Sequence, residues 1–255
     1  MNSLCNTLCN AELIRYSRQL LLDGWDIDAQ LCLKNKVVAI VGMGGLGAMI
    51  APILVRAGVG TVHLFDFDNV EDSNLQRQLL YTHEHIGKPK ALCAKDVLTK
   101  QNELIELHAH CTRLDDDNIL ACLQDLKLDL LIDGSDNFST RILLNQTSQK
   151  LQTPLLSLSA IAEVGQVALF EPSTTGCYSC VFGTPSTTKQ SCANSGVLAS
   201  TVAVIGAYGA DVALHFLGKG INTIQNQLVM WHGTKAGLQK MYFSKNSHCP
   251  DCGVL

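Results

Sequence analysis

Charged residues are scarce in this sequence, and no targeting signal is evident. Asp, Glu, Lys and Arg make up only 16% of the 255 residues, with a net charge of −4. This balance does not suggest a general nucleic-acid binder or a binder of acidic membranes. The N-terminus MNSLCNTLCN lacks the basic stretch followed by an apolar stretch that begins a secretory signal. We therefore expect a cytoplasmic protein with no nucleic-acid partner.

Long hydrophobic runs are confined to one segment, residues 197–217. This run is long enough to suggest a membrane span, but it contains Asp211, His215 and two glycines, and no aromatic or basic flank brackets it. We expect a buried helix, packed on a sheet or on a partner subunit, and no membrane association. Internal repeats, Pro-rich linkers and low-complexity tracts are also lacking.

Apolar residues make up 47% of the chain, enough for a large core. Through the first 160 residues, short apolar runs alternate with helical patterns. The runs predict strands at 37–41, 61–66, 105–111, 129–133 and 154–159, and helices at 11–22, 45–57, 89–100, 117–125 and 138–150. This order predicts an α/β fold with a doubly wound, mainly parallel, Rossmann-like sheet. Beyond it we expect strands at 166–170, 177–182, 227–232 and 238–243, a loop at 183–195 and a long helix at 196–217.

A glycine motif follows the first expected strand. Gly42, Gly44 and Gly47 fit G-x-G-x-x-G and open the next helix. Such glycines permit a tight turn and a close approach of phosphates to a helix N-terminus, whose dipole favours anions. Asp66 ends the second strand, where a carboxylate can accept hydrogen bonds from ribose hydroxyls. The pattern predicts a bound nucleotide but does not separate NAD from ATP.

Three charged residues favour ATP. Cleaving ATP between its α and β phosphates needs positive charge at the phosphates and a carboxylate for Mg²⁺. Arg77 follows the second strand, Lys90 begins a helix, and Asp136 follows the strand at 129–133. Each residue alone would be interpreted as a surface charge. Together at one sheet edge they indicate a phosphate and metal site and argue against an NAD-dependent oxidoreductase.

The cysteines suggest a metal site. Cys177 and Cys180 form one Cys-x-x-Cys pair, and Cys249 and Cys252 form a second. Four thiolates in two such knuckles suit tetrahedral Zn²⁺ and leave no ligand position open, so the zinc would be structural. A redox dithiol or simple reduced thiols are the alternatives. The total of eleven cysteines is odd, which fits reduced thiols better than a disulfide framework.

Six motifs in order, RYSRQ, GMGGLG, DFD, SNLQRQ, GKPKA and DGSDN, resemble those of the ThiF/MoeB/HesA family, bacterial relatives of ubiquitin-activating enzymes. The resemblance runs from about Arg15 to Gly253. It implies ATP-dependent adenylation of the C-terminal glycine of a small ubiquitin-like sulfur carrier ending in Gly-Gly, with release of pyrophosphate. It further implies one adenylation domain, with a nucleotide-binding part at 1–160 and a carrier- and zinc-binding part at 161–255.

The resemblance also implies roles for individual residues. Asp66 is expected to bind the ribose, and Asp136 the Mg²⁺ at the reaction centre. Arg18 matches an arginine that reaches into the partner subunit's site, which implies a homodimer; without the resemblance it would be interpreted as a surface charge. The triphosphate is expected at Asn74, Arg77 and Lys90. Further nucleotide contacts are expected at Gly42, Gly44, Gly45, Gly47, Asp68 and Asn137.

Two departures from the family pattern bear on these expectations. Cys192 matches a cysteine that bonds covalently to the carrier in some members and is dispensable in others. Asn194 stands where relatives usually have glutamate. A catalytic thioester and a loop cysteine without a covalent role therefore both stay open. DGSDN replaces the commoner DCTDN, but the matching aspartate and asparagine are kept.

The resemblance leaves the pathway open between molybdopterin and thiamine synthesis. GWDIDAQ resembles molybdopterin members, which we favour slightly, and RYSRQLLLDG resembles thiamine members as much. The chain ends soon after the second cysteine pair, so we expect a separate sulfur donor such as a cysteine desulfurase or a rhodanese. A tRNA-modifying enzyme would be expected to show a basic surface. A catalytically silent scaffold would be expected to lack Arg77, Lys90 or Asp136.

Overall fold

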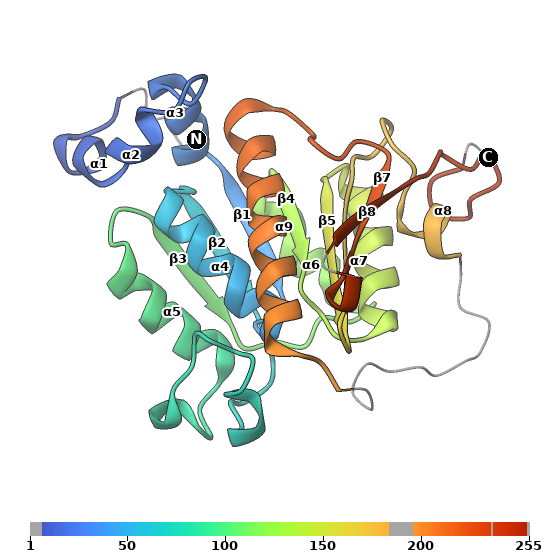
Figure 1. Ribbon diagram of the computed structural model, residues 1–255, viewed down its shortest axis with the longest axis horizontal. Helices are drawn as coiled ribbons and strands as arrows, with labels where there is room; N and C mark the ends of the chain where they lie inside the picture. Colours follow the sequence, from blue (N-terminus) through green and yellow to red (C-terminus); the bar gives the residue numbers. More distant parts are fainter. Residues whose placement is uncertain (1–6, 184–195, 236, 254–255) are drawn as a thin grey trace.

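One mixed sheet organises the chain in the computed structural model (Figure 1), which describes residues 7–183, 196–235 and 237–253. Within these residues the sheet has eight strands in the order β3-β2-β1-β4-β5-β6-β7-β8. The parallel part comprises β1 (Val37–Val41), β2 (Thr61–Phe65), β3 (Glu106–His110), β4 (Leu130–Asp133) and β5 (Leu155–Ile161). The antiparallel part comprises β6 (Val164–Phe170), β7 (Gln227–His232) and β8 (Gly237–Tyr242). The predicted doubly wound, mainly parallel sheet is confirmed.

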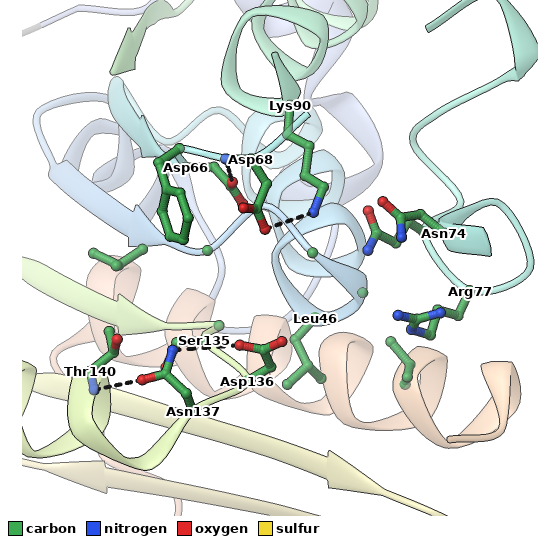
Figure 2. A pocket seen from close by; sticks show the side chains of 18 of the residues that line it. Leu46, Asp66, Asp68, Asn74, Arg77, Lys90, Ser135, Asp136, Asn137 and Thr140 are labelled. Carbon is green, nitrogen blue, oxygen red and sulfur yellow. Dashed lines mark hydrogen bonds and ion pairs between the residues drawn. The ribbon is translucent and has the colours of Figure 1, made fainter. Parts of the chain in front are cut away.

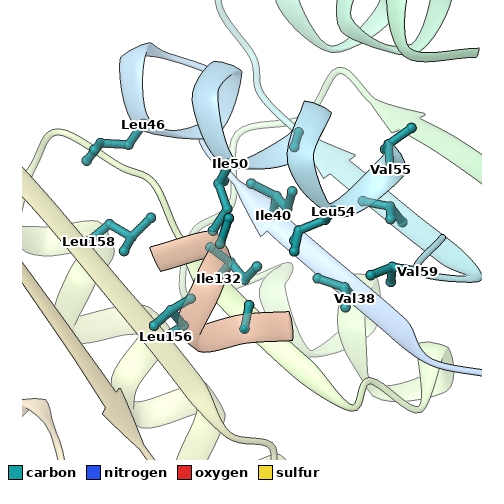
Figure 3. Close-up of a cluster of buried hydrophobic side chains, with 14 of the residues drawn as sticks. Val38, Ile40, Leu46, Ile50, Leu54, Val55, Val59, Ile132, Leu156 and Leu158 are labelled. Carbon is teal, nitrogen blue, oxygen red and sulfur yellow. The ribbon is translucent and has the colours of Figure 1, made fainter. Parts of the chain in front are cut away.

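Helices cover both faces of the sheet because successive strand residues point to opposite sides. Val38 and Ile40 pack with the core of one face, while Ala39 and Val41 pack with the core of the other. The first core is covered by α3 (Ile27–Lys34), α4 (Gly45–Ala57), α5 (Lys90–Gln101) and α9 (Ala199–Lys219), and Figure 3 shows part of it. The second is covered by α6 (Ile119–Leu123), α7 (Phe138–Leu151) and α8 (Tyr178–Phe182).

The long helix α9 packs inside the fold, as the sequence predicted. By length and composition it is the one described helix that could cross a membrane, but 56% of its most apolar stretch is buried. Gly206 allows close contact with α4, because a Cβ there would lie 2.6 Å from the Cβ of Met49. Gly209 faces Leu158 of β5 in the same way. The glycines of this helix therefore serve close packing in the core.

The structure corrects two predicted elements and adds one. The helix expected at 11–22 is two short helices, α1 (Asn10–Arg15) and α2 (Ser17–Leu20), which meet at the buried Tyr16. The strand expected at 177–182 is wrong: this segment is helix α8, because the Cys177–Cys180 turn bonds the Cys180 N–H to the Cys177 carbonyl at 3.0 Å. Helix α3 was not predicted; Asp26 caps its N-terminus.

Short 3-10 helices complete the described chain. They cover Asp72–Asn74, His83–His85, Gln124–Leu126 and Gly233–Lys235. The first two lie between β2 and α5, in the connection that carries the predicted phosphate-binding residues. In Figure 1 this connection projects below the sheet, at the end of the molecule opposite α1 and α2.

Candidate functional site

A pocket of about 640 Å³ opens at the carboxyl ends of the parallel strands. Most of its lining residues come from the segments 41–46, 65–78, 112–114 and 134–141, and others come from the region leading into α9. The sheet order reverses between β1 and β4, and open α/β sheets bind ligands at such a reversal. Ten predicted residues line this pocket: Gly42, Gly44, Gly45, Asp66, Asp68, Asn74, Arg77, Lys90, Asp136 and Asn137.

The glycine loop is held in place from two sides. Asp66 Oδ2 accepts a hydrogen bond from the Met43 N–H at 2.7 Å, and the Tyr81 hydroxyl donates to the Met43 carbonyl at 2.8 Å. Gly42 adopts a φ of +91°, and a Cβ there would lie 2.8 Å from the Gly134 carbonyl oxygen, so no other residue fits. The loop is therefore preorganised to present backbone N–H groups at the N-terminus of α4.

Gly47, the last glycine of the motif, does not line the pocket. A Cβ at this position would collide with the carbonyl oxygen of Gly42. Gly47 therefore lets α4 pack tightly against the loop, and its expected contact with the nucleotide stays a prediction.

Asp66 accepts backbone hydrogen bonds through both of its carboxylate oxygens. It is only 8% exposed, and its second oxygen accepts a hydrogen bond from the Asp68 N–H at 2.8 Å. Burial raises the pKa of Asp66, while the backbone donors and Lys90 oppose this rise. Because each carboxylate oxygen can accept more than one hydrogen bond, Asp66 can still accept from a ligand hydroxyl.

The positive and negative side chains of the pocket come from separate elements and point toward a common space (Figure 2). Lys90 is buried at the start of α5, and its Nζ lies 3.2 Å from Asp68 Oδ2. Arg77 Nη1 donates to the Ser73 carbonyl at 3.1 Å. Asp136 is exposed at the opposite wall, where its Oδ1 accepts a long hydrogen bond of 3.5 Å from Asn137 Nδ2, so its carboxylate can meet a cation. This arrangement can hold a polyanion between lysine, arginine and a helix N-terminus.

Residues that sequence reasoning missed hold the turn around Asp136. The buried Arg141 donates to the Ser135 carbonyl at 3.1 Å and to Ser159 Oγ at 3.0 Å. Asp133 is fully buried and accepts from Ser135 Oγ at 2.6 Å; burial raises the pKa of Asp133, and Arg141 opposes this. Only the position of Asp133 within DGSDN hinted at a role. Nothing in the sequence linked Arg141 or Ser159 to it.

Part of the pocket lining is apolar. Val41, Phe65 and Leu114 contribute to it although they are largely buried, and the Arg113 guanidinium lies 5.2 Å from the centre of the exposed Phe67 ring. The pocket lining thus combines polar and cationic groups with apolar side chains. A nucleotide combines phosphates with a base in the same way.

The four predicted metal ligands come together as a second site. The Sγ atoms of Cys177, Cys180, Cys249 and Cys252 all lie within 4.8 Å of one another. Neighbouring pairs are 3.9, 3.5 and 3.4 Å apart. Disulfide sulfurs would be about 2 Å apart, whereas ligands about 2.3 Å from a tetrahedral zinc are roughly 3.8 Å apart. The cluster therefore fits zinc. Burial raises the pKa of Cys177, so a cation is needed to favour its thiolate.

The cysteine cluster is connected to α7 by a buried polar network. Asp251, between Cys249 and Cys252, accepts hydrogen bonds from Asn145 at 2.9 Å, Gln146 at 3.1 Å and Ser179 at 2.5 Å. Asn145 is fully buried, and its Oδ1 accepts from the Tyr178 N–H at 2.9 Å. The N-terminal cap of α7 is Asn137, which lines the pocket. One helix thus joins the two sites.

Arg18, another predicted site residue, does not line the pocket of its own chain. Arg18 is exposed on α2, outside the pocket lining and at the other end of the molecule (Figure 1). Cys192 lies outside the residues that the structure describes. The roles expected for both residues stay predictions.

Comparison with known proteins adds independent information. The model of the ThiF family matches residues 16–252. The sulfur carrier protein adenylyltransferase of Thermus thermophilus is 40% identical over 250 residues, 95% of this chain and 91% of that protein. Two Escherichia coli proteins are 36% identical: molybdopterin-synthase adenylyltransferase (96% of this chain, 98% of that protein) and sulfur carrier protein ThiS adenylyltransferase (95% and 96%). The crystal structure of E. coli MccB with AMPCPP and MccA has a TM-score of 0.83 at 25% identity, covering 94% of this chain and 74% of that one.

Proposed function

The chain belongs to the ThiF family, and we propose that it transfers the adenylyl group of ATP to the C-terminal carboxylate of a small ubiquitin-like sulfur carrier. The observation that carries this proposal is the pocket at the strand reversal. It combines the glycine loop, Arg77 and Lys90 with an exposed aspartate, Asp136. The relatives at 36–40% identity are named adenylyltransferases of sulfur carriers or of molybdopterin synthase.

The chemistry follows from the groups available. The carrier's terminal carboxylate oxygen attacks the α-phosphorus, a new phosphorus–oxygen bond forms, and the bond to the bridging oxygen breaks so that pyrophosphate leaves. The nucleophile is already ionised at pH 7, so no protein side chain has to remove a proton. The protein's work is to align the carboxylate with the leaving group and to offset the charge that builds on the phosphates.

The pocket supplies these functions from named residues. Backbone N–H groups of the loop around Gly44 and Gly45 bind phosphate at the N-terminus of α4. Arg77 and Lys90 add positive charge, with Lys90 exchanging its contact to Asp68 for the phosphates. Mg²⁺, when bound, neutralises phosphate charge. Asp136 fits it as a carboxylate ligand, because it is exposed at the wall facing the cationic side chains.

Apolar side chains of the pocket suit the base of the nucleotide. Val41, Phe65 and Leu114 belong to its lining, and Asp66 directly follows Phe65 in the chain. Its spare acceptor capacity supports the proposal that Asp66 binds the ribose, as expected from the sequence. The crystal structure of MccB with AMPCPP, which shares this fold, supports an adenine nucleotide as the ligand.

We propose that the carrier tail reaches the reaction centre beside α9. Ala160, Gly196, Val197 and Val202 form this wall of the pocket. They belong to the region from 161 onward, or lie at its border, which the family resemblance links to carrier binding. We keep the division into a nucleotide-binding part at 1–160 and a carrier- and zinc-binding part at 161–255 as a proposal.

The cysteine cluster is proposed to hold a structural zinc. All four ligands are cysteines, so no position is left for a substrate. The ion would tie the C-terminal segment to α8, and through Asp251 to α7. Its contribution is therefore to folding rather than to the reaction.

We also propose a homodimer in which Arg18 completes the partner subunit's site. Its exposed position on α2, far from its own pocket, fits a contact across subunits. An Arg18→Ala subunit and an Asp136→Ala subunit, each inactive alone, should regain activity when mixed. Mixtures that stay inactive would contradict the shared site.

The sulfur carrier can belong to either of two biosynthetic pathways. We propose molybdopterin synthesis first, because GWDIDAQ resembles molybdopterin members. Thiamine synthesis is the alternative, because the two E. coli relatives are equally identical to the chain. ATP–pyrophosphate exchange with purified carriers of each pathway, tested one at a time, separates them. Exchange that depends on one carrier identifies the pathway. Exchange with none, in zinc-loaded protein supplied with Mg²⁺, would contradict the proposed function.

A further inference from the structure

Gln78 is a pocket residue to which the proposed function gives no role. It ends the SNLQRQ motif, its side chain is only 3% exposed, and it lines the pocket next to Arg77. Its Nε2 lies 3.8 Å from the position that a Cβ on Gly44 would occupy. The amide therefore stands beside the glycine loop, at the point where the loop enters α4.

The other end of this amide is poorly satisfied. Gln78 Oε1 is buried, and in the parts of the chain that the structure describes no donor reaches it. A buried acceptor loses its hydrogen bonds to water on folding and here gains none in return, which destabilises the fold. A methionine of similar size would avoid that loss. A polar group kept in a pocket at the expense of stability points to a use in ligand binding.

The position defines the ligand group. Helix N-termini and glycine loops attract anions. Arg77 lies on the same side, with its Cγ 3.8 Å from the position of a Cβ on Gly45. Among the groups of a nucleotide, the phosphates match a helix N-terminus that is flanked by an arginine. An amide nitrogen can donate to a phosphate oxygen without adding charge.

We propose that Gln78 is a phosphate-binding residue whose Nε2 donates a hydrogen bond to the polyphosphate of the bound nucleotide. The proposal rests on the proposed function for the identity of the nucleotide. It adds a neutral donor to the contacts expected from Asn74, Arg77 and Lys90.

Calorimetry on three proteins tests the proposal: wild type, Gln78→Met, and the matched control Gln124→Met, which changes an exposed glutamine in a distant 3-10 helix. In the presence of Mg²⁺, Gln78→Met should bind ATP about ten- to a hundred-fold more weakly, the loss of one hydrogen bond to a charged group. Its affinity for adenosine, which has no phosphate, should be unchanged. Its melting temperature without nucleotide should be equal to that of wild type or higher, because the unpaired oxygen is gone.

Other results would overturn the proposal. An ATP affinity within twofold of wild type would do so, as would equal weakening for ATP and adenosine. A lower melting temperature would show that Gln78 is a structural residue. Gln78→Glu gives a second test, since a carboxylate of the same size repels phosphate and should weaken ATP binding further than methionine does. A wild-type protein that binds no ATP would contradict the proposed function together with this inference, whereas unchanged ATP binding by Gln78→Met contradicts the inference alone.

Discussion

Replacing Asp251 by alanine tests how the cysteine cluster is joined to the rest of the fold. The carboxylate accepts side-chain hydrogen bonds from Asn145, Gln146 and Ser179. A hydrogen bond to a charged group contributes about 1.5–3 kcal/mol. Part of the loss is recovered, because Asn145 Nδ2 also lies 3.3 Å from Ser179 Oγ. We expect Asp251→Ala to lower the free energy of unfolding by about 2–4 kcal/mol.

This loss is large enough to measure. For a chain of this size, each kcal/mol shifts the melting temperature by about 2–4 °C, so the expected decrease is roughly 4–16 °C. Because Asp251 lies between two of the cysteines, it also orients them, and we expect zinc affinity to fall by about ten- to a hundred-fold. Calorimetric melting of zinc-loaded protein measures the first effect, and competition with a chelator measures the second.

The matched control is Asp125→Ala, which removes an exposed aspartate that no described residue bonds. It should leave both quantities unchanged, since isolated surface substitutions usually alter stability by less than about 0.5 kcal/mol. If the melting temperature of Asp251→Ala lies within about 1 °C of that of the control, the network makes no net contribution to stability and the reasoning is wrong.

Three further predictions concern the pocket, the metal and pH. Asp136→Ala should reduce ATP–pyrophosphate exchange by roughly a hundred-fold or more without changing the melting temperature, because the side chain is exposed; retained exchange would sink its assignment. Removing zinc with a chelator should lower the melting temperature, and metal analysis should find one zinc per chain; a value near zero would contradict the site. His63 is buried against His108 and His110, and burial followed by these neighbours lowers its pKa from 6.5 to about 4. The unfolded chain binds this proton more tightly than the folded protein does. The neutral His63 side chain therefore contributes about 2–3 kcal/mol to the free energy of unfolding above pH 6.5, and this contribution is lost as the pH falls toward 4. Denaturant titrations should show that the free energy of unfolding depends less on pH in His63→Phe than in wild type. An equal pH dependence in the two proteins would refute this prediction.

Features set by local sequence were predictable. The G-x-G-x-x-G motif lies between an apolar strand and a helix, and Asp66 ends the following strand, so both had to meet at one sheet edge. The alternation of short apolar runs with helical patterns likewise predicted the parallel core of the sheet. Helix α9 was correctly expected to be buried, because Asp211 and the two glycines fit packing better than a membrane. The short spacing of each cysteine pair likewise indicated a knuckle.

Features that depend on distant contacts were not predictable. Tyr81 holds Met43, 38 positions away in sequence, and only the folded chain shows why its hydroxyl is there. Arg141 reaches Ser159 of β5, and Asp251 reaches Asn145, for similar reasons. The mistaken strand at 177–182 has a different cause, since a short apolar run fits strand and helix equally well. In this segment the turn between Cys177 and Cys180 makes the chain helical.

The central claim is that this chain adenylates the C-terminal glycine of a ubiquitin-like sulfur carrier. The most direct test is mass spectrometry of a carrier ending in Gly-Gly after incubation with ATP, Mg²⁺ and the zinc-loaded protein. The account predicts that wild-type protein attaches one AMP to the terminal carboxylate of the carrier and that Lys90→Ala does not. A carrier that stays unmodified, with protein shown to bind ATP, would contradict it.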